Sequence, residues 1–297
     1  MSLPTAIRAA SQNRSERNDM KIHTLNCGYI RIHEDLLYGG GSIMTDFRKA
    51  DMAPDSRRVT LPVFAYLFEH PAGLFLVDTG LSRDISPDGV YDPKAVRSVL
   101  PAHLAALYRP YVPEGKAINE QLRSMSIRQE DINAVLITHL DPDHVSGLRS
   151  VDRVKRIVIP EDEAYWSVRT KYRIRQPEHL WDIEGAERVF FRGHLLGPMH
   201  KAIDITGDGS IMMVNLPGHT DGLCGVIVRD GDKYVLLASD AAVSPRSWEK
   251  MEPPGLGADP ALQHKSLSWI ADTASDPACI TVLCSHDKEI KTETIEL

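Results

Sequence analysis

The chain has 297 residues, of which 42% are hydrophobic and 25% charged, values typical of a globular protein that can bury a full core without disulfides. Its 34 basic and 41 acidic residues give a net charge of −7, which argues against a general nucleic-acid binder, because such proteins need excess basic charge to neutralise phosphates. No apolar run approaches the roughly 18–20 residues that cross a bilayer. We therefore expect neither a nucleic-acid nor a membrane partner.

Residues 1–19 are polar, carry three arginines and lack the apolar segment of a secretory signal. They predict a flexible N-terminal arm before a single domain over 20–297, with an organelle-targeting role as the alternative. Because the four cysteines form no CxxC pair, reduced thiols and a cytoplasmic location are expected. These cysteines are Cys27, Cys224, Cys279 and Cys284.

Apolar runs that end in polar clusters recur along the chain and predict strands buried on both faces. Patterns of helical period lie between them. Strands that alternate with helices indicate a layered α/β architecture. The expected strands are 74–77, 134–137, 211–216, 235–238 and 280–283, and the expected helices are 93–107, 118–125, 161–168 and 260–273.

Two segments stand apart from this alternation. Residues 161–204 are rich in aromatic and charged side chains, which predicts a helical insertion packed on the core or, alternatively, a wall of a substrate pocket. Residues 30–44 contain Gly39-Gly-Gly41 and are interpreted as a second loop over the same pocket.

The most informative string is Thr138-His-Leu-Asp-Pro-Asp-His-Val-Ser-Gly147, which directly follows a predicted strand. It places His139, Asp141, Asp143 and His144 within six residues, and imidazole with carboxylate suits zinc, iron or manganese. A turn of capped surface polar residues is the alternative. Three later strands also end in polar residues, and these contribute His219, Asp240 and His286. Together they favour a metal site at the strand ends.

This order of motifs resembles the metallo-β-lactamase fold superfamily. The strings Leu61-Pro-Val-Phe-Ala-Tyr-Leu and Gly73-Leu-Phe-Leu-Val-Asp-Thr-Gly80 are similar to the opening strands of its N-acyl-homoserine lactonase-like branch. The resemblance covers the chain from about residue 60 to the C-terminus. It implies a four-layer αββα sandwich of two similar halves, with a dinuclear metal site at one edge between the sheets.

The resemblance also implies roles for individual residues. Two divalent ions, zinc in the first place, would share the bridging Asp240, and a water or hydroxide between them would be the nucleophile. Asp143 would help to hold that nucleophile and move its proton, and Asp78 would orient a ligand. The first ion would take His139, Asp141 and His219, and the second Asp143, His144 and His286.

Three positions depart from the family pattern. Asp141 stands where His is commonest, so the site carries one more negative charge, which weakens it as a Lewis acid and shifts its preference toward iron or manganese. Because Asp is also shorter than His, we expect a weaker or more exchangeable first ion. Val243 replaces a tyrosine of many such lactonases. Asp240 stands where several β-lactamases have cysteine, which makes β-lactam hydrolysis less favoured. The candidates to replace the tyrosine hydroxyl are His194, Tyr165 and Tyr172.

The expected function is therefore that of a metal-dependent hydrolase that opens an ester-like carbonyl, first of all a lactone such as an N-acyl-homoserine lactone. The alternatives are hydrolysis of a thioester, phosphodiester or organophosphate, or a catalytically silent metal-binding protein. The expected partner is a small-molecule substrate, and a homodimer is compatible with the resemblance.

Overall fold

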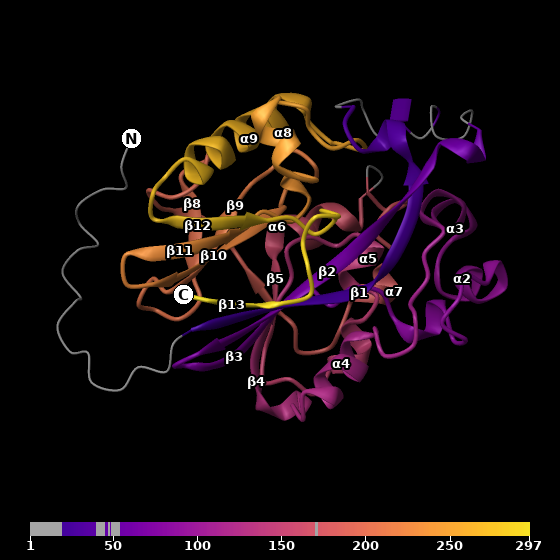
Figure 1. The fold of residues 1–297 in the computed structure, drawn as a ribbon, viewed down its shortest axis with the longest axis horizontal. Helices are drawn as coiled ribbons and strands as arrows, with labels where there is room; N and C mark the ends of the chain where they lie inside the picture. Colours follow the sequence, from indigo (N-terminus) through magenta and orange to yellow (C-terminus); the bar gives the residue numbers. More distant parts are fainter. Residues whose placement is uncertain (1–19, 40–44, 47, 49–53, 170–171) are drawn as a thin grey trace.

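The computed structural model describes residues 20–39, 45–46, 48, 54–169 and 172–297. The expected arm over 1–19 lies outside the described residues. Two β-sheets pack face to face, and helices cover the outer face of each (Figure 1). This four-layer order confirms the αββα sandwich that the family resemblance implies.

The first sheet combines an antiparallel and a parallel half. Strands β1, β2 and β3 pair antiparallel, whereas β3, β4, β5 and β6 run parallel. Its order is β13 (Thr294–Glu296), β1 (Lys21–His33), β2 (Arg58–His70), β3 (Gly73–Val77), β4 (Ile132–Leu136), β5 (Ile157–Pro160) and β6 (Glu187–Val189).

The second sheet is antiparallel except where β12 pairs parallel with β11. Its order is β12 (Cys279–Leu283), β11 (Lys233–Leu237), β10 (Cys224–Asp230), β9 (Ile211–Asn215), β8 (Lys201–Asp204) and β7 (Arg192–Gly193). The five expected strands are thus confirmed as β3, β4, β9, β11 and β12.

The sheets meet through a core to which both contribute. Phe64 and Phe68 of β2 point into it, while Ala65 and Leu67 of the same strand point to the outer helices. Met213 of β9 faces the first sheet from the other side. Because successive side chains of a strand alternate between faces, a sheet covered on both sides requires apolar residues at nearly every position.

The helices form the two outer layers. Those on the first sheet are α2 (Pro93–Val99), α3 (Ala102–Tyr108), α4 (Ile118–Ser124), α5 (Pro142–Val145), α6 (Glu161–Ser167) and α7 (Glu178–Trp181), and those on the second are α8 (Pro245–Glu249) and α9 (Pro260–Ala274). The expected helix over 93–107 is divided in two. Leu100 is extended, with ψ of 143°, because Pro101 disfavours the helical conformation of the residue before it.

The segment 161–204 is only partly the helical insertion that was expected. It holds α6 and α7, but it also supplies β6 to the first sheet and β7 and β8 to the second. It therefore connects the two halves. Among the helices of the described residues, none has both the length and the hydropathy needed to span a bilayer.

Candidate metal centre

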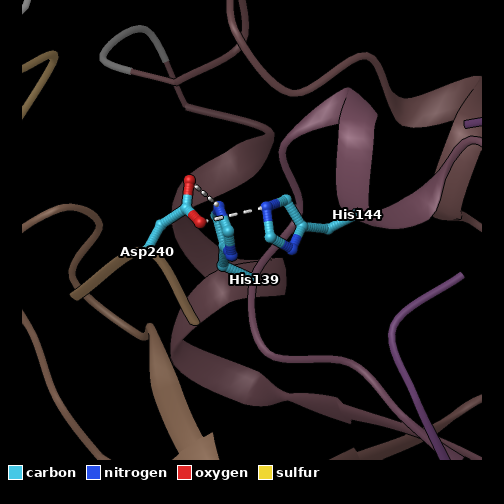
Figure 2. A group of neighbouring side chains, drawn as sticks. All are labelled: His139, His144 and Asp240. Carbon is cyan, nitrogen blue, oxygen red and sulfur yellow. Dashed lines mark ion pairs between the residues drawn. The ribbon is translucent and has the colours of Figure 1, made fainter. Parts of the chain in front are cut away.

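Every side chain that the motifs select lies at one edge of the sandwich. Asp78 follows β3, His139 follows β4 and His219 follows β9, while Asp240 and His286 follow β11 and β12. Asp143 and His144 lie on α5, which begins at Pro142, a residue whose fixed φ suits the first helical position. All are buried, and the seven proposed ligands come together in the fold. Figure 2 shows three of them, His139, His144 and Asp240, pointing toward one another.

Four of these residues, Asp143, His144, Asp240 and His286, form what we call the Asp143 cluster. His286 Nε2 lies 3.3 Å from Asp143 Oδ2 and 3.3 Å from Asp240 Oδ2. His144 Nε2 lies 3.3 Å from Asp240 Oδ1. Tetrahedral zinc, with bonds of roughly 2.0–2.1 Å, separates its ligand atoms by about 3.3–3.4 Å. The spacing within this cluster is therefore that of a metal coordination shell.

Hydrogen bonds at the Nδ1 atoms orient the imidazoles. His144 Nδ1 donates to Asp78 Oδ2 at 2.8 Å, and His286 Nδ1 donates to the Pro62 carbonyl at 2.8 Å. This leaves each Nε2 lone pair directed into the cluster. Within the described part of the chain, four buried atoms of the centre have no hydrogen-bond partner: His139 Nε2, His144 Nε2, His219 Nδ1 and Asp240 Oδ1. Buried polar atoms of this kind are those that a metal ion satisfies, so the residues fit one.

Asp78 has the geometry that its expected role requires. Its φ of 57° lies in the left-handed region, which costs on the order of 1–3 kcal/mol for a residue other than glycine. Its carboxylate accepts from the backbone nitrogen and the hydroxyl of Thr138, both at 2.8 Å, and from His144. These bonds hold the strained residue in place and fix the His144 ring.

The remaining three proposed ligands, His139, Asp141 and His219, form what we call the Asp141 cluster. Here the structure adds a residue that sequence reasoning missed. Arg175 is fully buried, and its Nε donates to both carboxylate oxygens of Asp141 at 2.8 Å. Its Nη2 contacts Asp141 Oδ2 and His219 Nε2, and its Nη1 donates to the Leu256 carbonyl. A guanidinium therefore lies among the ligands of this cluster.

Sequence gave only an indirect signal for Arg175. Arg175 is the last of several basic residues in the string 169–175, and nothing in that string distinguishes it from a solvated arginine. The unusual carboxylate at Asp141 was the signal, since a buried extra acid requires a partner. The charge count that predicted a weaker Lewis acid from Asp141 omitted this arginine, which cancels the added negative charge.

The charges of the centre set its pKa values. Burial opposes ionisation of Asp141, but Arg175 and the imidazoles outweigh it and hold the pKa of this carboxyl well below its usual range. Burial and Arg175 together lower the pKa of His219 to about 4, so its ring is neutral. For His286, burial is outweighed by Asp240 and Asp143, which raise its pKa to about 10. The two clusters thus differ in protonation. The Asp141 cluster holds the neutral imidazole of His219 beside the ion pair of Asp141 and Arg175, whereas His286 of the Asp143 cluster binds a proton in the ion-free protein.

An apolar pocket of about 50 Å³ opens onto the centre. Asp141, Asp143, His219, Asp240 and His286 form its polar end. Its apolar side chains come from β1, the turn after it, β2, α3 and the segments after β11 and α8, and comprise Ile30, Ile32, Leu36, Leu37, Leu61, Tyr108, Val243, Pro254 and Leu256. The expected loop over 30–44 thus contributes through a strand and a turn, and its residues 40–44 lie outside the described part.

The three candidates for the missing tyrosine hydroxyl have other contacts. Tyr172 donates to Asp221 at 2.7 Å, Tyr165 is 45% exposed, and His194 Nδ1 accepts from the Leu196 nitrogen at 3.1 Å. None of them is among the residues that line the pocket. The phenol that does line it, beside Val243, is Tyr108.

Fold and site together define a metallo-hydrolase whose proposed ligands lie at one edge of two packed sheets. The family model of the metallo-beta-lactamase superfamily matches residues 58–278, and the chain belongs to that superfamily.

Its relatives include N-acyl homoserine lactonases. The chain is 25% identical to AiiB of Rhizobium rhizogenes over 290 residues, which cover 91% of this chain and 94% of that protein. It is 25% identical to AttM of Agrobacterium fabrum over 241 residues, or 77% and 83% of the two chains.

The fold is similar to that of an N-acyl homoserine lactone hydrolase solved with N-hexanoyl-L-homoserine at its catalytic metal centre. The TM-score is 0.71 at 18% identity, and the match covers 94% of this chain and 100% of the other. The structure of AidC, a dizinc quorum-quenching lactonase, matches with a TM-score of 0.59 at 14% identity over 96% of both chains.

Proposed function

We propose that this protein is a metal-dependent hydrolase that opens an ester-like carbonyl, first of all a lactone such as an N-acyl-homoserine lactone. The observation that carries the proposal is the pocket itself. Asp143, Asp240 and His286, which belong to a cluster with metal-ligand spacing, contribute to its polar end, and its walls are apolar. A pocket of about 50 Å³ admits only a small group, and a reactive carbonyl with its adjoining carbons would match both surfaces.

The Asp143 cluster would hold a metal ion through Asp143, His144, Asp240 and His286. Such an ion, when bound, would supply Lewis acidity and lower the pKa of a water molecule. Zinc is the first choice, because imidazole and carboxylate suit it and because Arg175 offsets the carboxylate that argued for iron or manganese. The second ion of the expected pair would require the ligands of the Asp141 cluster, where Arg175 lies.

The chain's own carboxylates would handle the proton. Asp143 and Asp240 line the pocket, with Oδ2 of each 3.3 Å from His286 Nε2. Asp143 would accept the proton of the attacking water at its carboxylate and pass it to the leaving oxygen. Asp240 would hold the centre together from the other sheet. Both are the catalytic residues of this proposal.

Tyr108 would replace the hydroxyl that Val243 lacks. Burial and the carboxylate of Asp141 raise the pKa of this phenol well above its usual value, so it stays protonated at any working pH. A protonated phenol beside the centre can donate a hydrogen bond to the carbonyl oxygen as charge develops on it. This would place the oxyanion contact on α3 rather than on the segment after β11.

The names of the relatives support a lactone: AiiB and AttM are N-acyl homoserine lactonases, and one structural neighbour holds an opened acyl-homoserine product. The homodimer and the cytoplasmic location stay predictions.

The test is a substrate panel. Purified protein loaded with zinc, manganese or iron is assayed against acyl-homoserine lactones, thioesters, phosphodiesters and organophosphates, with products identified by mass spectrometry. We expect the ring-opened hydroxy acid from lactones, at rates well above those for the other classes. A higher kcat/KM for a thioester, phosphodiester or organophosphate would replace the lactone proposal. No turnover of any class by metal-loaded protein would favour a silent metal-binding protein.

A further inference from the structure

The Asp141 cluster and the Asp143 cluster are not equivalent. In the Asp143 cluster, His144 Nε2 has no hydrogen-bond partner within the described residues. Each carboxylate oxygen of Asp240 lies 3.3 Å from an imidazole nitrogen, of His144 or of His286. In the Asp141 cluster, His219 Nε2 is already in contact with Arg175 Nη2. The clusters therefore differ in whether a guanidinium already occupies the ring nitrogen that an ion would need.

An imidazole Nε2 has one lone pair, which lies in the ring plane. It can accept a hydrogen bond or ligate a metal ion, but not both at once. His219 Nε2 and Asp141 Oδ2 are 3.4 Å apart, the separation expected of two ligands of one ion. Arg175 Nη2 contacts both of these atoms. The guanidinium thus uses the two atoms that an ion in this cluster would need.

Arg175 is also held firmly in that position. Nε donates to both oxygens of Asp141, and Nη1 donates to the carbonyl of Leu256, so each face of the fork has a fixed partner. The side chain is fully buried, which leaves no solvent into which it can turn. An ion in the Asp141 cluster would have to displace a buried, paired cation and then remain beside it.

We propose that this chain retains one metal ion, in the Asp143 cluster, and that the Arg175 guanidinium takes the place of the other. The fixed cation neutralises Asp141 and keeps it and His219 from acting as ligands. His139 Nε2 has no hydrogen-bond partner among the described residues and lies 3.9 Å from Asp240 Oδ2, so this ring would remain available to the retained ion. Arg175 is a positioning residue here, because its donors are engaged by Asp141, His219 and Leu256.

The test is a titration of ion-free protein with Co²⁺, followed by visible absorption, and with ¹¹³Cd²⁺, followed by cadmium NMR. We expect one equivalent to bind tightly, a single ¹¹³Cd resonance, and any second equivalent at least about 100-fold weaker. On Cd²⁺ binding, the ring ¹⁵N signals of His144 and His286 should shift, while those of His219 should not. These readouts do not depend on turnover.

The paired variant is Asp141→His with Arg175→Met, which removes the buried acid and the buried base together. It should bind two equivalents of Co²⁺ and show two ¹¹³Cd resonances. The matched control is Arg83→Met, because Arg83 pairs with Glu120 of α4 and is not among the residues of either cluster, and it should bind one equivalent.

If the unmodified protein binds two equivalents of Co²⁺ with similar affinity, this inference is wrong, while the proposed hydrolase function is unaffected. A folded paired variant that still binds only one equivalent of Co²⁺ would also overturn the inference. If the paired variant does not fold, the unmodified protein decides alone. Protein that binds no ion would overturn both this inference and the metal-dependent function.

Discussion

His144 donates its Nδ1 proton to Asp78 Oδ2 at 2.8 Å, although Asp78 follows β3 and His144 lies 66 residues later on α5. The bond fixes both the tautomer and the rotation of the ring, so that Nε2 faces Asp240. Asp78 in turn is held by Thr138. The ligand geometry of the Asp143 cluster therefore depends on a residue that does not itself face the pocket.

Asp78→Asn should weaken zinc binding by about 10–100-fold, because an amide nitrogen placed against His144 Nδ1 cannot accept its proton. Competition with a chromophoric chelator measures the affinity. Asp92→Asn is the control, since Asp92 caps α2 away from the centre. Equal zinc affinity in Asp78→Asn and the unmodified protein would show that this bond does not orient a ligand.

Asp240→Asn should reduce kcat by more than about 100-fold with little change in far-UV circular dichroism. Asp240 is the carboxylate that His139, His144, His219 and His286 all approach, so its charge is central to the site. Asp276→Asn, which alters an acid bonded to the Tyr234 hydroxyl, should keep its activity. A folded Asp240→Asn enzyme with most of its rate would refute the proposed chemistry.

Tyr108→Phe should lower kcat by about 10–100-fold and change KM much less, because the hydrogen bond that it removes strengthens as charge develops on the carbonyl oxygen. Steady-state kinetics on the best lactone separates the two constants. Tyr111→Phe is the matched control, since Tyr111 stacks on Tyr29 away from the pocket. If KM rises while kcat is unchanged, Tyr108 serves only substrate binding.

Zinc uptake at pH 7.5 should release protons. In the ion-free protein, burial of His286 is outweighed by Asp240 and Asp143, which raise its pKa from 6.5 to about 10, and the pKa of His144 is also raised. Both rings must lose a proton before Nε2 binds an ion. Calorimetry in buffers of different ionisation enthalpy gives the number released. An enthalpy that is the same in every buffer would contradict the prediction.

The raised pKa of His286 also predicts how the stability of the ion-free protein changes with pH. A histidine whose pKa is higher in the folded than in the unfolded chain stabilises the fold fully below the unfolded value of 6.5, and that contribution is lost as the pH rises toward 10. The free energy of unfolding of ion-free protein should therefore fall from pH 6.5 to 9.5. Chemical denaturation at several pH values measures it, with His286→Gln as the comparison that should lack the part of the trend that His286 contributes and keep the part that His144 contributes.

The strands and the ligand types were predictable because their signals are local. A buried strand in this sandwich is apolar at almost every position, and the polar residues that follow it, such as His139 or Asp240, lie at the sheet edge. Helix boundaries were less accessible, since Pro101 divides a pattern that reads as continuous. The segment 161–204 was misjudged in part because its short strands β6, β7 and β8 carry little periodicity.

The sequence by itself determined the order of the candidate ligands, the layered α/β class and the acid at Asp141, since each follows from residue type and strand period. Only the tertiary structure showed that Arg175 is the cation paired with Asp141 and that Tyr108 is the phenol that lines the pocket. Arg175 lies 34 residues beyond Asp141, and its guanidinium reaches the carboxylate because α6 and the turn after it return the chain to the centre. Contacts of this kind depend on the path of the whole chain, and no local pattern encodes them.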